Sequence, residues 1–364
     1  MKQKILFITN HSYMFWRFRK ELVEELLREH EVVVSTPFVG HEEDLEALGC
    51  RMVETSLDRR SINLLGEWKL LRFYFRLIRR EQPDMVITYS IKPNIYAGLA
   101  CRMLKIPYCI NVQGLGTAFQ TKGIAAVVSV LYRLACGKAR TVFFENEESA
   151  EIFRSRKITP AHKQTVLPGA GINLVNYPYV PYPQNEATHF LYLGRFMREK
   201  GMDELLYAAK RLYERYGNQV VLDLVGFFED AYRDQVNQLV EEGCAVFHGF
   251  QTDPRPFYAA TDCVVLPSHH EGLSNVLLEA AAIGRPIITN DIAGCREAVL
   301  RNESGLLCTV KDKESLFEAM DAFMKLPREE REAMGQCGRR YMDEFNKQKV
   351  VQNTVDAIFR TAKR

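Results

Sequence analysis

The sequence predicts an α/β protein made of two Rossmann-like domains, and three observations support this. Short apolar runs rich in β-branched residues alternate with amphipathic stretches, as in a parallel sheet covered by helices on both faces. The alternation stops at the Pro-rich segment 177–183 and resumes after it. The chain has 364 residues, which is more than one ordinary hydrophobic core organises.

The predicted strands fall into two sets, one on each side of the Pro-rich segment. The first set is 5–8, 31–35, 85–89, 108–112 and 141–144, and the second is 189–193, 220–225, 246–248, 263–266 and 286–289. We expect a first domain at 1–176, a linker at 177–187 and a second domain at 188–340. Residues 341–364 form a last helical stretch with no strand after it, which could pack back on the first domain. A cleft between the domains, at the carboxyl ends of both sheets, is the expected ligand site.

Composition excludes several classes of protein. Apolar residues at 47% and charged residues at 26% are typical of a globular protein. The nine cysteines are scattered without a C-x-x-C pair, which argues for a reducing compartment and against a disulfide framework or zinc site. No apolar run is long enough to span a bilayer. Residues 1–180 hold 25 Lys or Arg against 18 Asp or Glu, so we expect an anionic partner or membrane surface there, and no nucleic acid.

Glu271 and Glu279 are the most informative residues of the second domain. They follow the predicted strand 263–266, and their separation of eight residues is close to a whole number of helical turns. Gly272 lets the backbone approach a ligand, and the amides of a helix start attract an anion. Two acids that accept sugar or ribose hydroxyls, beside amides that bind phosphate, suit a nucleotide-sugar site. The alternative is a surface helix with two solvated acids.

A second motif lies on the loop after strand 189–193. Arg195 and Lys200 lie between Gly194 and Gly201. The planar guanidinium of Arg195 and the compact ammonium group of Lys200 both suit a diphosphate. The alternative is a solvated basic loop. Two further strands end in glycine at the same predicted sheet edge and bring their backbone close to a nucleotide base; the residues concerned are Gly226, His248 and Gly249. Residues 290–297 are expected at the rim of the pocket.

The order and spacing of these motifs resemble the retaining glycosyltransferases of family 4, which have the GT-B fold. The resemblance implies that Arg195 and Lys200 bind the donor diphosphate, that Glu279 holds the ribose and that Glu271 contacts the donor sugar. It also implies that backbone amides lie against the sugar and phosphate, those of Gly272, Leu273 and Ser274. Members of this fold use a UDP-sugar as co-substrate without a bound metal or other cofactor, and no Asp-x-Asp signature is present here. Phe227 and Phe228 replace the Gly-Pro that often precedes Glu229 in the family, which leaves base binding by this turn open.

Two segments of the first domain resemble a narrower group within this family. Residues 89–98 and 114–119 are similar to bacterial transferases that extend saccharides on undecaprenyl diphosphate, such as the N-acetylgalactosaminyltransferase of protein N-glycosylation. The acceptor side is then expected at Asn10, His11, Lys92, Asn94, Gln113, Gly114 and Gly116. Gln113 stands where many family members have His, and a Gln does not shuttle protons. A dinucleotide fingerprint at this turn lacks its third Gly. His11 is expected either to contact the acceptor or to cap the helix that follows.

A lipid-linked acceptor requires membrane access, and residues 68–80 offer a broad apolar arc with a basic stripe. The residues expected to contact an anionic membrane are Trp68, Lys69, Arg72, Arg76, Arg79 and Arg80. A second aromatic and basic patch lies at residues 15–20. The protein is accordingly expected to be cytoplasmic and peripheral on the inner face of the plasma membrane. The alternative is a helix that packs its apolar face on a sheet.

The resulting hypothesis is transfer of a hexose or N-acetylhexosamine, with GalNAc or GlcNAc as best candidates, from a UDP-sugar to an undecaprenyl-diphosphate-linked saccharide. No motif places a carboxylate nucleophile in the first domain, which favours front-face substitution with retention. Three alternatives stay open: a transferase with a soluble acceptor, a UDP-sugar epimerase on the same fold and a non-catalytic sensor of nucleotide sugars.

Overall fold

The chain forms two compact units. The computed structural model describes residues 2–55, 64–115, 119 and 122–360. The first unit is Met1–Ala170 together with Gln348–Arg364, and the second is Gly171–Lys347. The expected linker at 177–187 therefore lies inside the second unit, and the chain returns to the first unit at residue 348, later than the expected 341.

Arg285 explains why the Pro-rich segment belongs to the second unit. Its side chain is fully buried, and its guanidinium donates to the carbonyls of Val180 and Pro181 at 3.1 and 2.9 Å. The amide of Val180 donates to Ile283 in return. Residues expected to join two domains are thus fixed to one of them, by an interaction that is not local in sequence.

The first unit contains a parallel sheet of seven strands in the order β3-β2-β1-β4-β5-β6-β7. The strands are β1 (Lys4–Ile8), β2 (Glu31–Thr36), β3 (Arg51–Glu54), β4 (Met85–Tyr89), β5 (Tyr108–Val112), β6 (Thr141–Phe144) and β7 (Gln164–Val166). The sequence did not predict β3 and β7. Both are short edge strands with no fully buried residue, so neither has an apolar run.

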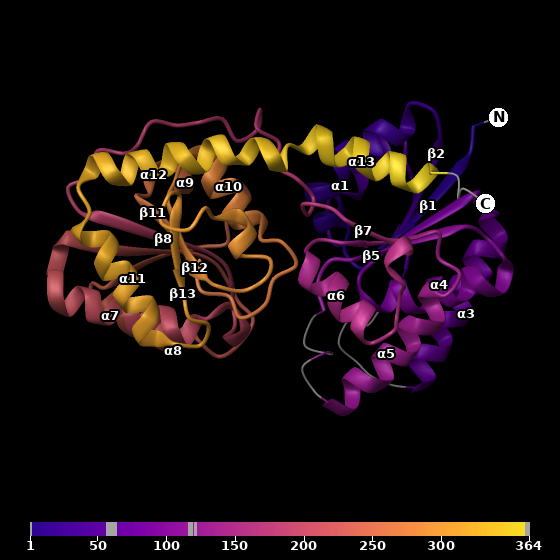
Figure 1. Ribbon diagram of the computed structural model, residues 1–364, viewed down its shortest axis with the longest axis horizontal. Helices are drawn as coiled ribbons and strands as arrows, with labels where there is room; N and C mark the ends of the chain where they lie inside the picture. The colour runs from indigo at the N-terminus through magenta and orange to yellow at the C-terminus, as the bar shows by residue number, and fades with distance from the viewer. Residues whose placement is uncertain (1, 56–63, 116–118, 120–121, 361–364) are drawn as a thin grey trace. The chain divides into compact units, whose positions relative to one another are not determined.

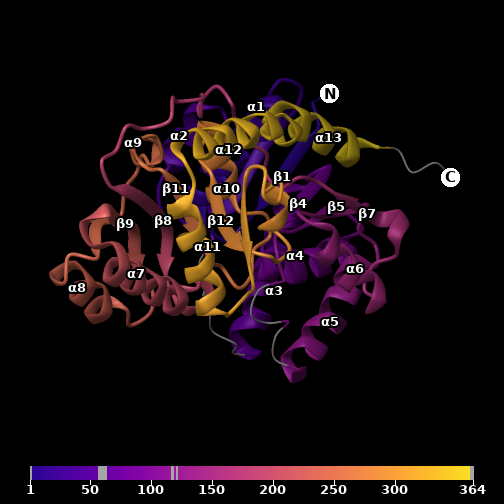
Figure 2. The same cartoon turned by 60° about the vertical axis from the view of Figure 1, so that its left-hand side comes forward.

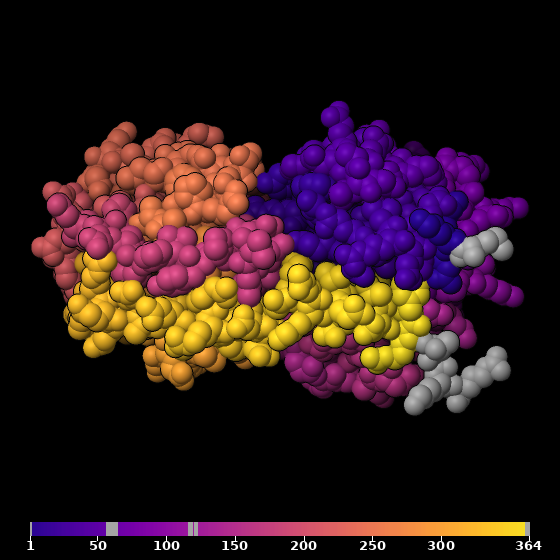
Figure 3. All heavy atoms as spheres, turned by 90° about the horizontal axis from the view of Figure 1, so that it is seen from above, coloured from indigo at the N-terminus to yellow at the C-terminus, as the bar shows by residue number. Residues whose placement is uncertain are grey.

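Helices cover both faces of this sheet (Figure 1). They are α1 (Ser12–Leu27), α2 (Glu42–Ala47), α3 (Leu64–Glu81), α4 (Ile91–Leu104), α5 (Lys122–Cys136), α6 (Glu147–Ser155) and α13 (Lys347–Phe359). One face is covered by α3, α4 and α5, and the other by α1 and α13, each with its own apolar core. Figure 3 shows the yellow residues of α13 lying against the indigo surface of the first unit.

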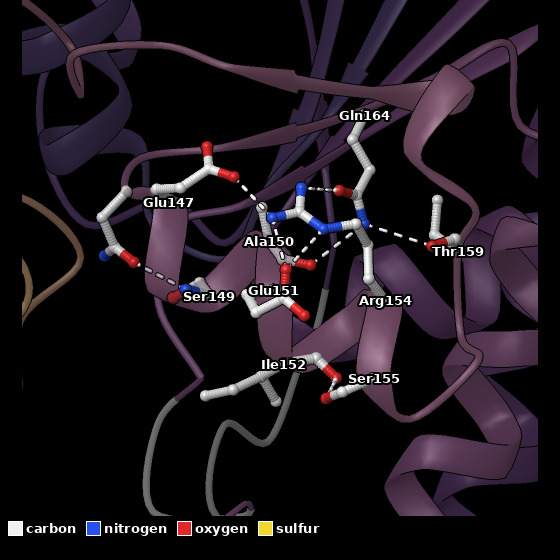
Figure 4. Close-up of polar contacts among 10 residues, drawn as sticks. Glu147, Ser149, Ala150, Glu151, Ile152, Arg154, Ser155, Thr159 and Gln164 are labelled. Carbon is white, nitrogen blue, oxygen red and sulfur yellow. Dashed lines mark hydrogen bonds and ion pairs between the residues drawn. The ribbon is translucent and has the colours of Figure 1, made fainter.

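The helix α6 shows how local polar contacts fix an element of this unit (Figure 4). The side chain of Asn146 caps its start by accepting the amide of Ser149 at 2.8 Å. Arg154 near its end pairs with Glu147 at 2.5 Å and donates to Gln164 at 2.8 Å. These contacts join the helix to β7.

The second unit contains a parallel sheet of six strands in the order β10-β9-β8-β11-β12-β13. The strands are β8 (Thr188–Phe196), β9 (Val220–Phe228), β10 (Ala245–Gly249), β11 (Cys263–Leu266), β12 (Ile287–Asn290) and β13 (Gly305–Cys308). The helices are α7 (Met202–Tyr216), α8 (Arg233–Glu241), α9 (Arg255–Ala260), α10 (Asn275–Ile283), α11 (Lys313–Lys325) and α12 (Arg328–Tyr341). Figures 1 and 2 show α7 and α11 side by side, and α9, α10 and α12 together on the other side of the sheet.

Each sheet has one point where the strand order reverses, between β1 and β4 in the first unit and between β8 and β11 in the second. Ligands of open parallel sheets bind beyond the carboxyl ends of the strands at such points. The loops that follow β8 and β11 carry Lys200 and Glu271, so the two strongest sequence motifs meet at the reversal point of the second sheet.

Candidate active site

A close strand pair places Arg195 at the end of β8. Gly194 is the partner of Gly226 in the pairing of β8 with β9. Gly226 has φ +149°, and a Cβ there would lie 1.8 Å from the carbonyl oxygen of Gly194. Only glycine permits this approach, which keeps the strands paired beyond Arg195. The Arg195 side chain is about half-exposed, and its Nη1 lies 2.6 Å from Oε2 of Glu229 on the loop after β9.

Lys200 and Glu271 form the central contact of the site. Nζ of Lys200 lies 2.5 Å from Oε1 of Glu271, and only 18% and 14% of the two side chains are exposed. The buried Tyr192 donates its hydroxyl to the carbonyl of Arg195 at 2.7 Å. Burial and, secondly, the charge of Glu271 raise the pKa of Tyr192 well above its usual value. The site therefore holds a cation and an anion in contact, together with a buried tyrosine that stays neutral.

The loop after β11 is held in place by the loop after β8. Gly201 has φ +74°, and a Cβ there would lie 2.0 Å from the carbonyl oxygen of Pro267. The amide of His269 donates to the carbonyl of Glu199 at 2.8 Å. From the other side, the side chain of Asn290 on β12 donates to the Pro267 carbonyl at 2.8 Å. These contacts fix the path of the chain into Glu271.

Gly294 supports the same loop from the residues that follow β12. Its φ is +83°, and a Cβ there would lie 2.5 Å from the carbonyl oxygen of Gly272 and 2.7 Å from that of Glu271. The Gly294 carbonyl accepts the amide of Ser274 at 2.8 Å, and its amide donates to Glu297 at 2.7 Å. The segment 290–297 thus braces the Glu271 loop, a role that the sequence did not reveal.

The structure corrects the expected spacing of the glutamate pair. The helix α10 begins at Asn275, so Glu271 lies on the loop before it, and helical spacing does not relate the two acids. Glu279 is only 3% exposed, and its Oε2 accepts the hydroxyl of Tyr258 at 3.0 Å. The amide of Ser274, expected against the ligand, is instead hydrogen-bonded to Gly294. The amides of the first turn of α10 have no acceptor within the helix, as at any helix start.

His248 belongs to a polar trio within the second sheet. Its Nε2 lies 2.7 Å from Oδ1 of Asp223, and Nδ1 of His189 lies 2.8 Å from Oδ2. Burial acts to raise the pKa of Asp223, but hydrogen bonds from both histidines bring it below its usual value. The hydrogen bond to Asp223 raises the pKa of His189. The ring of His248 also contacts Phe257, so these contacts fix it within the fold, and its neighbour Gly249 turns the chain at φ +68°.

The predicted acceptor residues of the first unit have different environments. Asn94 is 1% exposed, accepts from Thr88 at 2.7 Å and donates to the carbonyl of Asn111 at 2.7 Å. Its side chain therefore ties α4 to the sheet, which contradicts the expected acceptor contact. Lys92 pairs with Glu67 of α3 at 2.8 Å and so links two helices.

Four other predicted acceptor residues follow the carboxyl ends of β1 and β5. Asn10 accepts the hydroxyl of Ser90 at 2.8 Å, across the point where the strand order reverses. His11 is the N-cap residue of α1, but its side chain makes no capping hydrogen bond, so the capping alternative is wrong. Gln113 and its neighbour Gly114 are half-buried in the loop after β5. Gly116 lies outside the described residues.

Two family sequence models match the chain. The model described as "Glycosyl transferase 4-like" matches residues 4–146, and "Glycosyl transferases group 1" matches residues 187–325. The chain is a family 4 glycosyltransferase with the GT-B fold. These matches confirm the predicted fold class and enzyme class.

Two curated relatives and one solved structure show how far the similarity of this glycosyltransferase extends. It is 26% identical over 342 residues to the N,N'-diacetylbacillosaminyl-diphospho-undecaprenol alpha-1,3-N-acetylgalactosaminyltransferase of Campylobacter jejuni, covering 88% of this chain and 89% of that protein. It is 26% identical over 285 residues to the UDP-Gal:alpha-D-GlcNAc-diphosphoundecaprenol alpha-1,3-galactosyltransferase of Escherichia coli, covering 72% and 71%. The structure of Anabaena HepE in complex with UDP and glucose is similar with a TM-score of 0.81 at 17% identity, over 99% of this chain and 100% of that one.

The helix α3 of the glycosyltransferase carries the residues that the sequence assigned to a membrane. Most of the apolar arc is core, because Leu70, Tyr74, Leu77 and Ile78 are buried against the sheet. The predicted contact residues are all exposed: Trp68, Lys69, Arg72, Arg76, Arg79 and Arg80. The second patch does not form as expected, since Phe15 is buried and Arg19 pairs with Glu145 at 2.8 Å.

Searches of the described residues gave two further findings about this glycosyltransferase. Within those residues, no helix is long and apolar enough to cross a membrane. The same residues contain no group of three or more His, Cys, Asp or Glu side chains that could hold a metal ion.

Proposed function

We propose that this glycosyltransferase moves a hexose or N-acetylhexosamine from a UDP-sugar to a saccharide carried on undecaprenyl diphosphate, with retention at the anomeric carbon. GalNAc and GlcNAc are the first candidates for the sugar. The observation that carries the proposal is the contact of Lys200 with Glu271 at the reversal point of the second sheet. The names of the relatives from Campylobacter jejuni and Escherichia coli support the lipid-linked acceptor.

The cations of the second unit match the charge that develops on the departing diphosphate. Arg195 and Lys200 follow the same strand, and each is paired with a carboxylate in the structure. A diphosphate that replaces those carboxylates gains two charge-assisted contacts, which strengthen as the bond to the sugar breaks. We assign the charge neutralisation to these two side chains, so the reaction runs without a bound metal.

Glu271 loses its ion pair when the diphosphate binds Lys200, and it then has a second role. Its carboxylate is then available to accept hydroxyls of the donor sugar, because the loop after β11 still holds it beside the ammonium group, 2.5 Å away in the structure. The departing diphosphate takes the proton of the acceptor hydroxyl, which is front-face substitution. Glu279 lies on α10, and we assign to it the ribose of the donor. The buried hydrogen bond between Tyr258 and Glu279 must break before the carboxylate can bind a ribose hydroxyl.

The exposed basic residues of α3 suggest where the reaction takes place. Five exposed Lys and Arg side chains along one helix suit an anionic lipid surface, and they are Lys69, Arg72, Arg76, Arg79 and Arg80. We propose that the enzyme acts on the inner face of the plasma membrane, where a UDP-sugar and a lipid-linked acceptor are both accessible.

A donor and acceptor screen tests this function. The purified protein is incubated in EDTA with UDP-GalNAc, UDP-GlcNAc, UDP-Gal or UDP-Glc and a diphosphate-linked monosaccharide on a lipid. One donor should yield a disaccharide with the anomeric configuration of the donor. Interconversion of the UDP-sugar without an acceptor would identify an epimerase, and equal transfer to free monosaccharides would remove the lipid-linked acceptor. Loss of activity in EDTA would refute metal independence.

A further inference from the structure

The solvent side of α5 is apolar along its length. Residues 123–132 contain no charged side chain. Four side chains at spacings of three or four residues are exposed on one side, namely Ile124 at 39%, Val127 at 61%, Val130 at 50% and Leu134 at 45%. The opposite side is also apolar, since Tyr132, Ala135 and Cys136 are buried in the core. Apart from Lys122 and Arg133 near its ends, α5 is therefore apolar on both sides, and one of these sides is exposed in this unit.

The neighbouring helices also carry exposed apolar side chains. The helix α4 contacts both α3 and α5, and all three cover the same face of the first sheet (Figures 1 and 2). Met103 of α4 is 64% exposed, and Leu65 and Trp68 of α3 are 74% and 59% exposed. Exposed apolar side chains are thus present on each of three adjacent helices, which is more than scattered single residues.

The charged residues of α4, α5 and the segments around them are all basic. From residue 85 to residue 144 the sequence contains no Asp or Glu, while it contains seven Lys and Arg. On α3, the guanidinium of Arg72 lies 5.5 Å from the ring centre of Trp68, so basic and apolar groups meet directly. A second copy of the chain would bring like charges together around the apolar face. An anionic lipid surface complements both the charge and the apolar side chains.

We propose that α5 inserts its apolar face into the anionic bilayer that holds the acceptor lipid, with the basic residues of α3 on the lipid headgroups. The proposal rests on the lipid-linked acceptor of the proposed function, and it names the element that enters the membrane. The sequence pointed to α3 and to residues 15–20, but in the structure the apolar residues of α3 are mostly core.

Vesicle binding of a double variant tests the insertion. Val127→Asp with Val130→Asp places two charges on the exposed face without touching the core. The control, Val175→Asp, changes a valine of the second unit that is 84% exposed. With vesicles of phosphatidylglycerol and phosphatidylethanolamine, the double variant should bind at least tenfold more weakly than wild type, and the control should bind equally well. Binding of the double variant equal to wild type would overturn the proposal.

Two further measurements distinguish a failure of the membrane insertion from a failure of the proposed function. With a short-chain, water-soluble acceptor the double variant should keep wild-type turnover, and with the undecaprenyl acceptor in vesicles it should lose at least tenfold. Absence of transfer to either acceptor in the wild type would refute the proposed function, while vesicle binding would still decide the insertion. If the substitutions instead convert a dimer to a monomer in sedimentation and leave vesicle binding unchanged, α5 is an interface between copies.

Discussion

Among single residues, Lys200 has the sharpest predicted effect. Lys200→Ala removes the cation that meets Glu271, so turnover should fall by roughly 10²–10³-fold, the usual cost of losing one group that stabilises developing charge. The melting temperature should change by at most a few degrees, since the side chain lies at the edge of the core. Lys210→Ala is the control, because Lys210 pairs with Glu242 at 3.2 Å on the surface of α7. Near-wild-type turnover of Lys200→Ala would refute the assigned role.

Glu229 is a residue whose importance only the structure reveals. It pairs with Arg195 at 2.6 Å, and 16% of its side chain is exposed. Glu229→Gln removes a negative charge beside the diphosphate site but also releases Arg195 from a fixed orientation. We expect UDP to bind severalfold more tightly, by roughly 1 kcal/mol, while kcat falls. Isothermal titration with UDP and initial rates measure the two effects, and unchanged values of both would show that the pair is only a surface contact.

The sequence located the charged residues of the site but not their partners. Arg195, Lys200 and Glu271 were predicted because each stands just after an apolar strand, and the carboxyl ends of parallel strands share one edge of the sheet. Glu229 shares that position, but its pairing with Arg195 depends on the register of β8 with β9. Asn94 was misassigned because its burial depends on Thr88 and Asn111, which no local pattern reveals.

Among the elements, the loop after β12 determines the position of the loop that carries Glu271. Gly294→Ala forces a side chain into φ +83° and against the carbonyls of Glu271 and Gly272. We expect a loss of roughly 1–3 kcal/mol in the free energy of unfolding, together with lower turnover. Gly123→Ala is the control, because a Cβ there meets nothing within 4 Å. Denaturant unfolding and initial rates test both variants, and an unaffected Gly294→Ala would mean that the loop shifts without cost.

The contact of β8, β9 and β10 through Asp223 predicts a pH dependence. The pKa of His189 is raised, so its contribution to stability is present below its unfolded value of 6.5 and is lost as pH rises through the folded value. The pKa of Asp223 is lowered, so its contribution is present above its unfolded value of 3.8 and is lost as pH falls. The difference in melting temperature between wild type and Asp223→Asn should therefore be largest between about pH 4 and 6.5. The exposed Asp234→Asn is the control, and a difference for Asp223→Asn that does not vary with pH would contradict the prediction.

The sequence predicted those strands correctly that are buried on both faces. Strands such as β1 and β4 are buried on both faces, and their continuous apolar runs reveal them. The strands β3 and β7 are short and partly exposed, so they leave no such run, and the apolar run of β13 is only four residues long. The helical spacing predicted for Glu271 and Glu279 was wrong, since the Glu271 loop is braced by Gly294 and α10 begins only at Asn275.

For the whole molecule, the two units are not consecutive pieces of the chain. The last helix, α13, supplies Val351, Ala357 and Ile358 to the core of the first unit. Arg140 donates to the carbonyl of Ile358 at 3.0 Å, and the rings of His30 and Phe359 stack with centres 4.8 Å apart. The first unit is therefore complete only after the second has been synthesised, which composition along the chain does not reveal.

This connectivity predicts which unit loses stability when the chain is shortened after residue 347. Deletion of residues 348–364 removes four buried apolar side chains from the first unit, and Ile358 alone, fully buried, stabilises it by about 1.5–3 kcal/mol. Hydrogen exchange followed by mass spectrometry should show lost protection in α1 and β2, whose residues form the same core, while β8 and β11 keep theirs. Ile358→Asp should reproduce the effect, and Asn353→Asp on the exposed side of α13 should not. Equal loss of protection in both units would show that they unfold as one cooperative structure.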